Sequence, residues 1–505
     1  MEKLTDVDAA VLEIEDGEVW DAVAAFDSAV RLERQARALG DDLLVQRARL
    51  CRVTMLMRTG DPVVAVRNIW GVHRWADQHR ETRLQARVQM VWSALHYVLG
   101  DAAKSLECAL RSVELLDETA TSYMRVWHRL KLADALAGLG SMEAARVRYA
   151  HAEEQCHRYD RPDLLLWVLN NHAYMEFANG DLERAERLAD RLREAAAELK
   201  PAQLDTIGQI EIGNGRFARA ERTLLLCLER CGDGREEEGH SLAGYLLTLA
   251  RARRGLGAYD RAQSSLDESR ALCDRRDLGH VLVQVHEEQA ELYAARGEHA
   301  AAFASFKEFH RAYVSRYTAD QESQARTRQA LFETAEAREE ARRDPLTGLR
   351  NRRFVDERLP ALIDGDPSLT VALVDVDHFK RINDELSHDV GDQVLVTLSQ
   401  LLVDGVASSV PDGFAARLGG EEFLLVLPRT PLPDALSLVD RIRETVSAHP
   451  WEMPFPVTIS AGLASVESAP TRTQAAVVAV ADRNLYAAKR SGRNRVMCET
   501  LQPTA

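Results

Sequence analysis

Two acidic stretches in the last third of the chain have the residue types and surroundings of a metal site. Asp375 ends the apolar run Val371–Val374, and Glu421-Glu422 directly follows Gly419-Gly420. An apolar strand gives a carboxylate at its end a rigid position, and adjacent glycines let the backbone turn tightly before a second strand begins. Proteins commonly hold Mg²⁺ with one or two carboxylates together with substrate phosphates. The sequence therefore predicts a site for Mg²⁺, or the similar Mn²⁺, between Asp375 and Glu421.

Basic residues in the same part of the chain could bind phosphate groups beside this metal. The helix expected to begin near Phe379 would point its free backbone N–H groups toward the site, and Lys380 follows in the same turn. Because phosphoryl transfer depends mostly on positioning and charge stabilisation, Lys380 is suited to stabilise a transition state. Lys489 and Arg493 are predicted to lie one turn apart on one side of a helix, where they would clamp terminal phosphate oxygens.

Five segments of the last third, in chain order, resemble the GGDEF family of diguanylate cyclases, here in its Gly-Gly-Glu-Glu-Phe variant. The segments are Asp344–Arg353, Asp375–Lys380, Asn383–Asp392, Arg417–Phe423 and Asp482–Asn494. The resemblance covers roughly residues 344–498, about a third of the chain.

The resemblance implies a role for each acidic residue. Asp375, Glu421 and the backbone carbonyl of Val376 would hold the metal. Glu421 would also assist deprotonation of the attacking hydroxyl, although the metal could supply much of that activation. Glu422 is the weaker candidate, as a second-metal or supporting ligand.

The resemblance also implies a guanine pocket. Asn383 and Asp392 match the residues that read guanine, and an Asp accepts from guanine N–H groups that adenine does not offer. His388 matches a residue near the nucleotide, and a purely structural role stays equally open for it. Ser387 stands where the family usually has Gly, a replacement that we expect to be tolerated.

One family feature is missing. Many relatives carry an Arg-x-x-Asp site for product inhibition, and the corresponding positions here are Val410 and Gly413. Neither can pair with a phosphate or a guanine, so feedback through that site is predicted to be absent.

The first 300 residues repeat at an interval of about 40 residues. A glycine is followed four or five residues later by a small residue, usually alanine, and successive glycines are 35 to 43 residues apart. These glycines are Gly17, Gly60, Gly100, Gly140, Gly180, Gly215, Gly257 and Gly297. Each would end one helix in a left-handed conformation, and the alanine would pack closely between that helix and the next. The pattern predicts a solenoid, for which tetratricopeptide-like repeats are favoured and HEAT-like repeats stay open.

Aromatic residues concentrate in the first half of this solenoid, which holds six of the seven tryptophans. They are Trp20, Trp70, Trp75, Trp92, Trp127 and Trp167. They could line a concave ligand groove or fill the core between repeats, and the core is favoured.

The predicted architecture is multidomain. Residues 1–302 form the all-α repeat domain, residues 303–343 a helical connector without Gly or Pro, and residues 344–500 an α+β domain of the nucleotidyl cyclase palm type. Apolar residues in the connector do not follow a strict heptad, so a short two-chain coiled coil and a solvated single helix both stay open. In the α+β domain, helices are expected to cover one face of an antiparallel-containing sheet.

Composition limits the function classes. Asp and Glu outnumber Lys and Arg by 79 to 64, which is no footprint of a nucleic-acid-binding protein. The N-terminus resembles no signal peptide, and no apolar run approaches the roughly 18 residues of a membrane helix, so a cytoplasmic protein without membrane contact is expected. The close pair Cys227 and Cys231 is interpreted as packing residues.

The predicted function is the condensation of two GTP into cyclic di-GMP and two pyrophosphates. Because each domain would hold one GTP, the reaction would require a homodimer. The repeat domain would regulate it by binding a peptide, a protein or a small molecule. The alternative is a catalytically silent GTP-binding receptor or scaffold that acts through the repeat domain.

Overall fold

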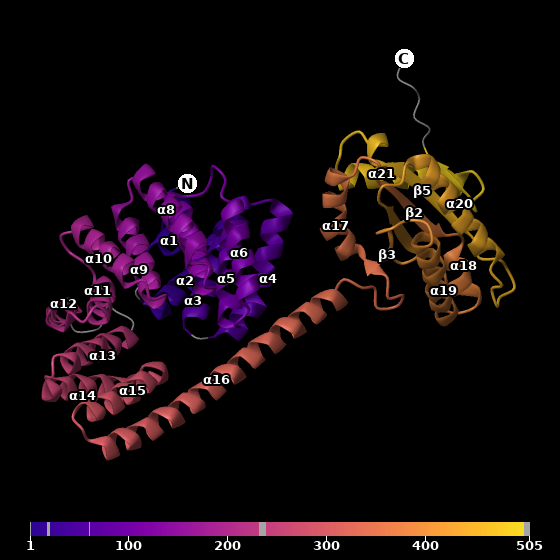
Figure 1. Ribbon diagram of the computed structural model, residues 1–505. Coiled ribbons are helices and arrows are strands. Elements are labelled where there is room, and N and C mark those ends of the chain that lie inside the picture. The colour runs from indigo at the N-terminus through magenta and orange to yellow at the C-terminus, as the bar shows by residue number, and fades with distance from the viewer. Residues whose placement is uncertain (1, 18–20, 60, 232–238, 499–505) are drawn as a thin grey trace. The chain divides into compact units, whose positions relative to one another are not determined.

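A computed structural model describes residues 2–17, 21–59, 61–231 and 239–498. The chain divides into two compact units, residues 1–332 and 333–505. The first unit is helical and the second contains the sheet (Figure 1).

Helices of the first unit follow one another through short turns. They are α1 (Glu2–Asp16), α2 (Ala22–Leu39), α3 (Asp42–Arg58), α4 (Pro62–His79), α5 (Thr82–Val98), α6 (Ala102–Glu114), α7 (Ser122–Gly138), α8 (Met142–Arg158), α9 (Pro162–Ala178), α10 (Leu182–Ala195), α11 (Pro201–Gly213), α12 (Phe217–Arg230), α13 (Gly239–Gly255), α14 (Tyr259–Arg276), α15 (Gly279–Ala295) and the first part of α16 (His299–Glu340).

The repeating glycines end helices, as their spacing predicts. Six of them, from Gly100 to Gly297, have φ between 71° and 83°, a left-handed conformation that glycine adopts without strain. Gly17 follows α1 without a left-handed backbone, and Gly60 lies outside the described residues.

Small residues after these glycines are packing points, which confirms the second part of the repeat pattern. Ala145, Ala185 and Ala220 have no exposed surface. After Gly100 a serine takes the position: the Ser105 hydroxyl donates to the Ser93 carbonyl at 2.9 Å, and the Ser93 hydroxyl donates to the Ser105 carbonyl at the same distance.

The tryptophans divide between core and margin. Trp92 is buried, while Trp70, Trp75, Trp127 and Trp167 are partly buried and pack against apolar clusters. Trp20 lies outside the described residues. Cys227 and Cys231 are buried in another apolar cluster, as expected of packing residues.

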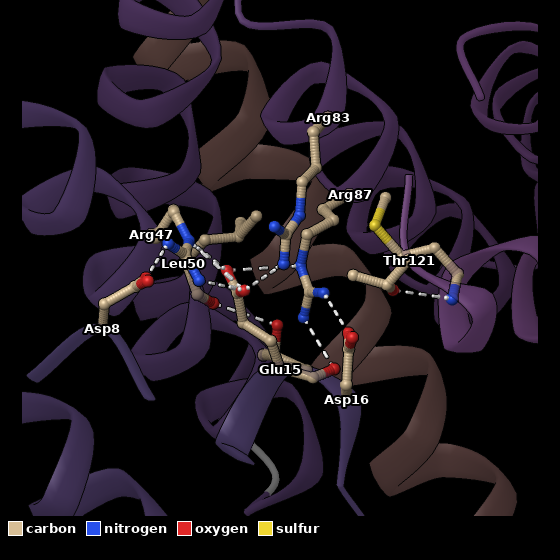
Figure 2. Close-up of polar contacts among 10 residues, drawn as sticks. Asp8, Glu15, Asp16, Arg47, Leu50, Arg83, Arg87 and Thr121 are labelled. Atoms are coloured by element: carbon tan, nitrogen blue, oxygen red, sulfur yellow. Dashed lines mark hydrogen bonds and ion pairs between the residues drawn. The ribbon is translucent and has the colours of Figure 1, made fainter. Parts of the chain in front are cut away.

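A buried carboxylate joins three helices of the first unit. Glu15 of α1 has a fully buried side chain and forms ion pairs with Arg47 of α3 at 2.8 Å and with Arg83 of α5 at 3.0 Å (Figure 2). Arg87 of α5 lies 3.7 Å from the same carboxylate and donates to the Glu15 carbonyl at 2.8 Å. Burial raises the pKa of Glu15, but the three arginines outweigh it and the net pKa is lowered.

The predicted connector is not a separate element, because α16 is one helix of 42 residues. In its first half it exposes one aromatic stripe, formed by Phe303, Phe306, Tyr313 and Tyr317. Farther along, Ala330 is buried in the same cluster as Trp92, and Arg328 donates to the Leu99 carbonyl at 2.6 Å. The helix is thus anchored to the first unit almost to the boundary at residue 332.

The second unit is built on a six-stranded mixed sheet with strand order β1-β3-β4-β2-β5-β6. The strands are β1 (Arg350–Asn351), β2 (Thr370–Val376), β3 (Phe414–Gly419), β4 (Glu422–Leu427), β5 (Ile459–Ser465) and β6 (Val496–Cys498). The helices are α17 (Arg352–Gly365), α18 (Phe379–Glu385), α19 (His388–Ala407), α20 (Leu432–Ala448) and α21 (Gln474–Arg490), with the short 3₁₀ helix η1 (Val466–Ser468).

Helices cover both faces of this sheet, so the prediction of one covered face is wrong. Val374 and Phe423 point to the side packed by α18, α19 and α20, whereas Leu373 and Leu424 point to the side packed by α17 and α21. Consecutive residues of a strand face opposite sides, and the central strand β2 is buried along its whole length. An almost wholly apolar strand therefore requires a cover on each face.

One helix in the described part of the chain, α19, is long and apolar enough to cross a membrane by length and composition. Its apolar residues, among them Leu395 and Leu398, pack in the core of the second unit.

Candidate active site

The two acidic stretches meet at one end of the central strands. Asp375, the sixth of seven residues of β2, lies opposite Glu422 of β4 and opposite Ser460 of β5. Glu421 directly precedes β4, and its carbonyl accepts from the Val376 backbone N–H at 3.4 Å. The structure thus brings all three carboxylates together, with Glu422 rather than Glu421 directly across from Asp375.

Two glycines make this arrangement possible. Gly419 has φ 145° and Gly420 has φ 54°, values that favour glycine, and they form the turn between β3 and β4. The chain reverses within these residues, and Glu421 is therefore delivered at the end of β2.

Electrostatics at this end of the sheet favour a cation. Burial raises the pKa of Asp375, and the negative charges of Glu422 and Asp377 raise it further, against the opposing effect of Lys489. The pKa of Glu421 is also raised, first by burial and then by the charge of Asp375. The Lys489 ammonium lies 2.7 Å from the Asp375 carboxylate and is one positive charge beside several negative ones.

Arg493 does not lie on a helix with Lys489, so that part of the sequence interpretation is wrong. Helix α21 ends at Arg490, and the next residues leave the helical conformation: Gly492 has φ 117°, Arg493 has φ 61° and Asn494 has φ 44°. Gly492 permits a left-handed turn after the helix, and the Arg493 backbone N–H then donates to the Ala488 carbonyl at 3.1 Å. Arg493 is exposed on this turn.

The predicted phosphate-binding residues of α18 lie just after β2. His378 takes a left-handed conformation with φ 57° and turns the chain from the strand into the helix. Phe379 is buried in the core and fixes the first turn of α18, while the neighbouring Lys380 is exposed.

The predicted guanine-binding residues are brought together where α18 meets α19. Asn383 is partly buried, and its side-chain oxygen occupies the space that a Cβ at residue 391 would need. Only glycine fits at that position, and it lets Asn383 approach the helix turn that carries the exposed Asp392. His388 is exposed at the first position of α19.

Ser387 has a structural role of its own. Its φ of 175° is extended backbone that any residue adopts, and its hydroxyl accepts from the Val390 N–H at 3.3 Å as the N-cap of α19. The backbone does not require glycine here, in agreement with the expected tolerance.

Comparison with known proteins identifies this part of the chain. Residues 341–495 match the family model described as diguanylate cyclase, GGDEF domain. This part of the chain is a GGDEF domain. The diguanylate cyclase DgcP of Pseudomonas aeruginosa is 40% identical over 167 residues, which cover 32% of this chain and 24% of DgcP. The response regulator PleD of Caulobacter vibrioides is 41% identical over 165 residues, which cover 30% of this chain and 35% of PleD.

Among solved structures, the GGDEF domain of DgcB from Caulobacter crescentus in complex with c-di-GMP is 33% identical, with 31% of this chain and 95% of that chain covered and a TM-score of 0.28. The chain spans about a quarter to a third of the length of the curated relatives that it matches. The matched family model leaves residues 1–340 outside.

The carboxylates of the GGDEF domain fit a magnesium ion that also binds phosphate. In the described ranges, no group of three or more His, Cys, Asp or Glu side chains is arranged to hold an ion by itself. Mg²⁺ needs only one or two carboxylates when phosphate oxygens supply the other ligands. Asp375, Glu421 and the carbonyl of Val376 can provide that smaller set, and the raised pKa values of both carboxyl groups show how much a cation would relieve.

Two residues of the GGDEF domain that sequence reasoning missed hold the catalytic turn. The Arg417 guanidinium donates to the Gly420 carbonyl at 3.0 and 2.7 Å and to the Asp344 carboxylate at 3.0 Å. Asp344 also accepts from the backbone N–H of Thr347 at 2.9 Å. The Asp-x-x-Thr spacing at the start of the domain was the available signal, because Asp commonly accepts from a backbone N–H a few residues ahead.

Proposed function

We propose that the chain is a diguanylate cyclase whose GGDEF domain condenses two GTP into cyclic di-GMP and two pyrophosphates. The observation that carries this proposal is the cluster of Asp375, Glu421 and Glu422 beside Lys489, in a domain that matches the diguanylate cyclase family model. Buried negative charge in excess of positive charge is the environment that a metal-bound triphosphate requires.

In the proposed reaction, the 3′-oxygen of each GTP attacks the α-phosphorus of the other. The bond from that phosphorus to the bridging oxygen breaks, pyrophosphate leaves, and the proton of the 3′-hydroxyl passes to a base. Glu421 is the proposed base because its raised pKa makes it a better proton acceptor than an ordinary glutamate. A divalent metal held by Asp375, Glu421 and the Val376 carbonyl would neutralise charge on the phosphates.

The remaining residues would bind and orient the nucleotide. The Phe379 N–H group, Lys380, Lys489 and Arg493 would contact phosphate oxygens, with Lys489 turning from Asp375 toward the nucleotide when the metal is bound. Asn383 and Asp392 would read guanine, with His388 beside them. Glu422 would support the metal ligands from the position across from Asp375.

A homodimer is part of the proposal because one domain offers one nucleotide site and the product contains two joined nucleotides. The exposed aromatic stripe of α16 gives a surface on which two copies could associate, with Phe303, Phe306, Tyr313 and Tyr317 each more than half exposed. The proposed boundaries are residues 1–302 for a tetratricopeptide-like regulatory domain, 303–343 for the connector and 344–500 for the cyclase. The regulatory ligand would be a peptide, a protein or a small molecule.

The test is a turnover assay on the full chain. Purified protein is incubated with GTP and Mg²⁺, and the products are separated by chromatography; we expect cyclic di-GMP with two pyrophosphates for each ring. Glu421→Gln should fold normally and lose turnover, while Glu444→Gln, an exposed glutamate of α20, should behave like the unsubstituted chain. GTP binding without any cyclic product, even when two chains are cross-linked, would favour the silent receptor instead.

A further inference from the structure

Asp377 is a buried carboxylate next to the proposed metal site that the proposed reaction does not use. It lies two residues after Asp375 and is 5% exposed. Its Oδ1 accepts from the Ser460 hydroxyl at 2.7 Å, and its Oδ2 accepts from the Thr458 hydroxyl at 2.8 Å and from the Asn494 backbone N–H at 2.9 Å. Three donors on one carboxylate leave little lone-pair capacity for an ion.

The partner Asn494 belongs to a turn with an uncommon backbone. Three consecutive residues, Gly492 to Asn494, have left-handed φ values, and two of them are not glycine. Such conformations persist only where surrounding contacts hold them. The Asn494 side-chain oxygen accepts from Arg443 of α20 at 3.2 Å, and the Asn494 backbone N–H is held by Asp377.

Arg493 is the residue between these anchors, and its backbone N–H is tied to Ala488 at 3.1 Å. Its exposed guanidinium can reach a phosphate only if the turn keeps this shape. The bond from Asn494 to Asp377 joins the turn to the end of β2, where Asp375 lies, across 117 residues of sequence. It therefore couples the place of Arg493 to the place of the metal ligands.

We propose that Asp377 is a positioning residue that fixes the Arg493 turn against β2, and that it is not a further metal ligand. The inference rests on the proposed GTP-binding function and adds to it a residue that decides affinity for the triphosphate. Hydrogen-bond acceptance, rather than negative charge, is the property of Asp377 that matters.

Two substitutions separate acceptance from charge. In Asp377→Asn, the amide oxygen can still accept from Asn494 and Thr458, while the amide NH₂ donates to the Ser460 hydroxyl, which can also accept. Asp377→Ala removes the acceptor and frees the turn. A metal ligand would lose its function in both variants, whereas a positioning residue loses it only in the second.

The experiment measures binding of a non-hydrolysable GTP analogue and of GMP to the full chain by calorimetry, at several Mg²⁺ concentrations. We expect Asp377→Ala and Arg493→Ala each to weaken the GTP analogue about tenfold, the equivalent of one lost charged contact, with GMP unaffected. The double variant should be no weaker than Arg493→Ala alone. Asp377→Asn should bind within about twofold of the unsubstituted chain, with the same Mg²⁺ dependence.

Several results would overturn the inference: a raised Mg²⁺ requirement in Asp377→Asn, additive losses in the double variant, or unchanged GTP affinity in Asp377→Ala. Ser460→Ala removes one donor but leaves the Asn494 bond, so it should bind the analogue normally. Together with Asp377→Asn it keeps the test decisive if Asp377→Ala does not fold. Failure of the unsubstituted chain to bind the analogue would refute the proposed function itself, a different outcome from normal binding that Asp377→Ala leaves unchanged.

Discussion

Buried carboxylates in the two units of this chain have opposite surroundings. In the helical unit, Glu15 is held by three arginines and its net pKa is lowered, and Glu176 is held by Arg146 through two contacts of 2.7 Å and is also lowered. In the GGDEF domain, the pKa values of Asp375 and Glu421 are raised, because acidic neighbours outnumber the one lysine. Fully paired charge holds helices together, whereas unbalanced charge at a strand end is available to bind a ligand.

The largest expected effect is on the unbalanced side of this comparison. Asp375→Asn removes a proposed metal ligand, and we expect turnover to fall by about 10²–10³, the usual cost of losing a main electrostatic contributor. Thermal stability should not fall, because the substitution also relieves repulsion with Glu421. Unfolding of the domain in this variant would instead make Asp375 a structural residue like Glu15.

On the paired side, Glu15→Ala should act on stability. It leaves three buried arginines without their shared partner, and we expect the free energy of unfolding of the helical unit to fall by about 3–5 kcal/mol. Denaturant unfolding followed by tryptophan fluorescence measures it, since six of the seven tryptophans lie in this unit. Glu13→Ala, an exposed site on the same helix, is the control and should change stability little.

A smaller effect is expected at Arg417, a paired charge that serves the catalytic turn. Arg417→Lys cannot reach both the Gly420 carbonyl and the Asp344 carboxylate with a fixed planar group, so we expect turnover to fall about tenfold. Arg429→Lys, which alters an exposed ion pair with Asp412, should leave turnover unchanged. Equal rates in both lysine variants would show that the turn does not depend on Arg417.

Acidification should move the two units in opposite directions. Glu15 has a lowered pKa, so its stabilisation is complete above its ordinary value of 4.5 and is lost as pH falls below it. Asp375 and Glu421 have raised pKa values, so their repulsion is present at neutral pH and is relieved as pH falls toward their ordinary values of 3.8 and 4.5. Thermal unfolding from about pH 7 to about pH 4 should show the GGDEF gain first and the helical loss below it, and Asp375→Asn with Glu421→Gln should abolish the gain.

The smallest expected effect is an absence of feedback. Val410 is buried in the apolar core and Gly413 packs against it, so neither offers a group for a cyclic dinucleotide. Product titrated into the turnover assay should inhibit only in competition with GTP. Potent non-competitive inhibition would contradict this prediction and point to a second binding site.

Local features of the fold were predictable because nearby residues decide them. The apolar run Thr370–Val376 forms β2, the glycines end helices where the repeat places them, and α21 covers Gln474–Arg490 as expected. Arg493 was misplaced because helical spacing was continued through Ser491-Gly492, where the backbone turns left-handed. The second covered face of the sheet was missed because a wholly apolar strand does not show which side each helix takes.

The sequence by itself determined the chemistry available to this protein: which residues are acidic or basic, and where strands and turns present them. Only the tertiary structure decided which of these groups meet. Strand register set Glu422 across from Asp375, the end of α21 brought Lys489 to the same carboxylate, and Asp377 found its partner at Asn494. The physical reason is that backbone conformation depends on neighbouring residues, while the pairing of distant charges depends on register and packing that no single segment contains.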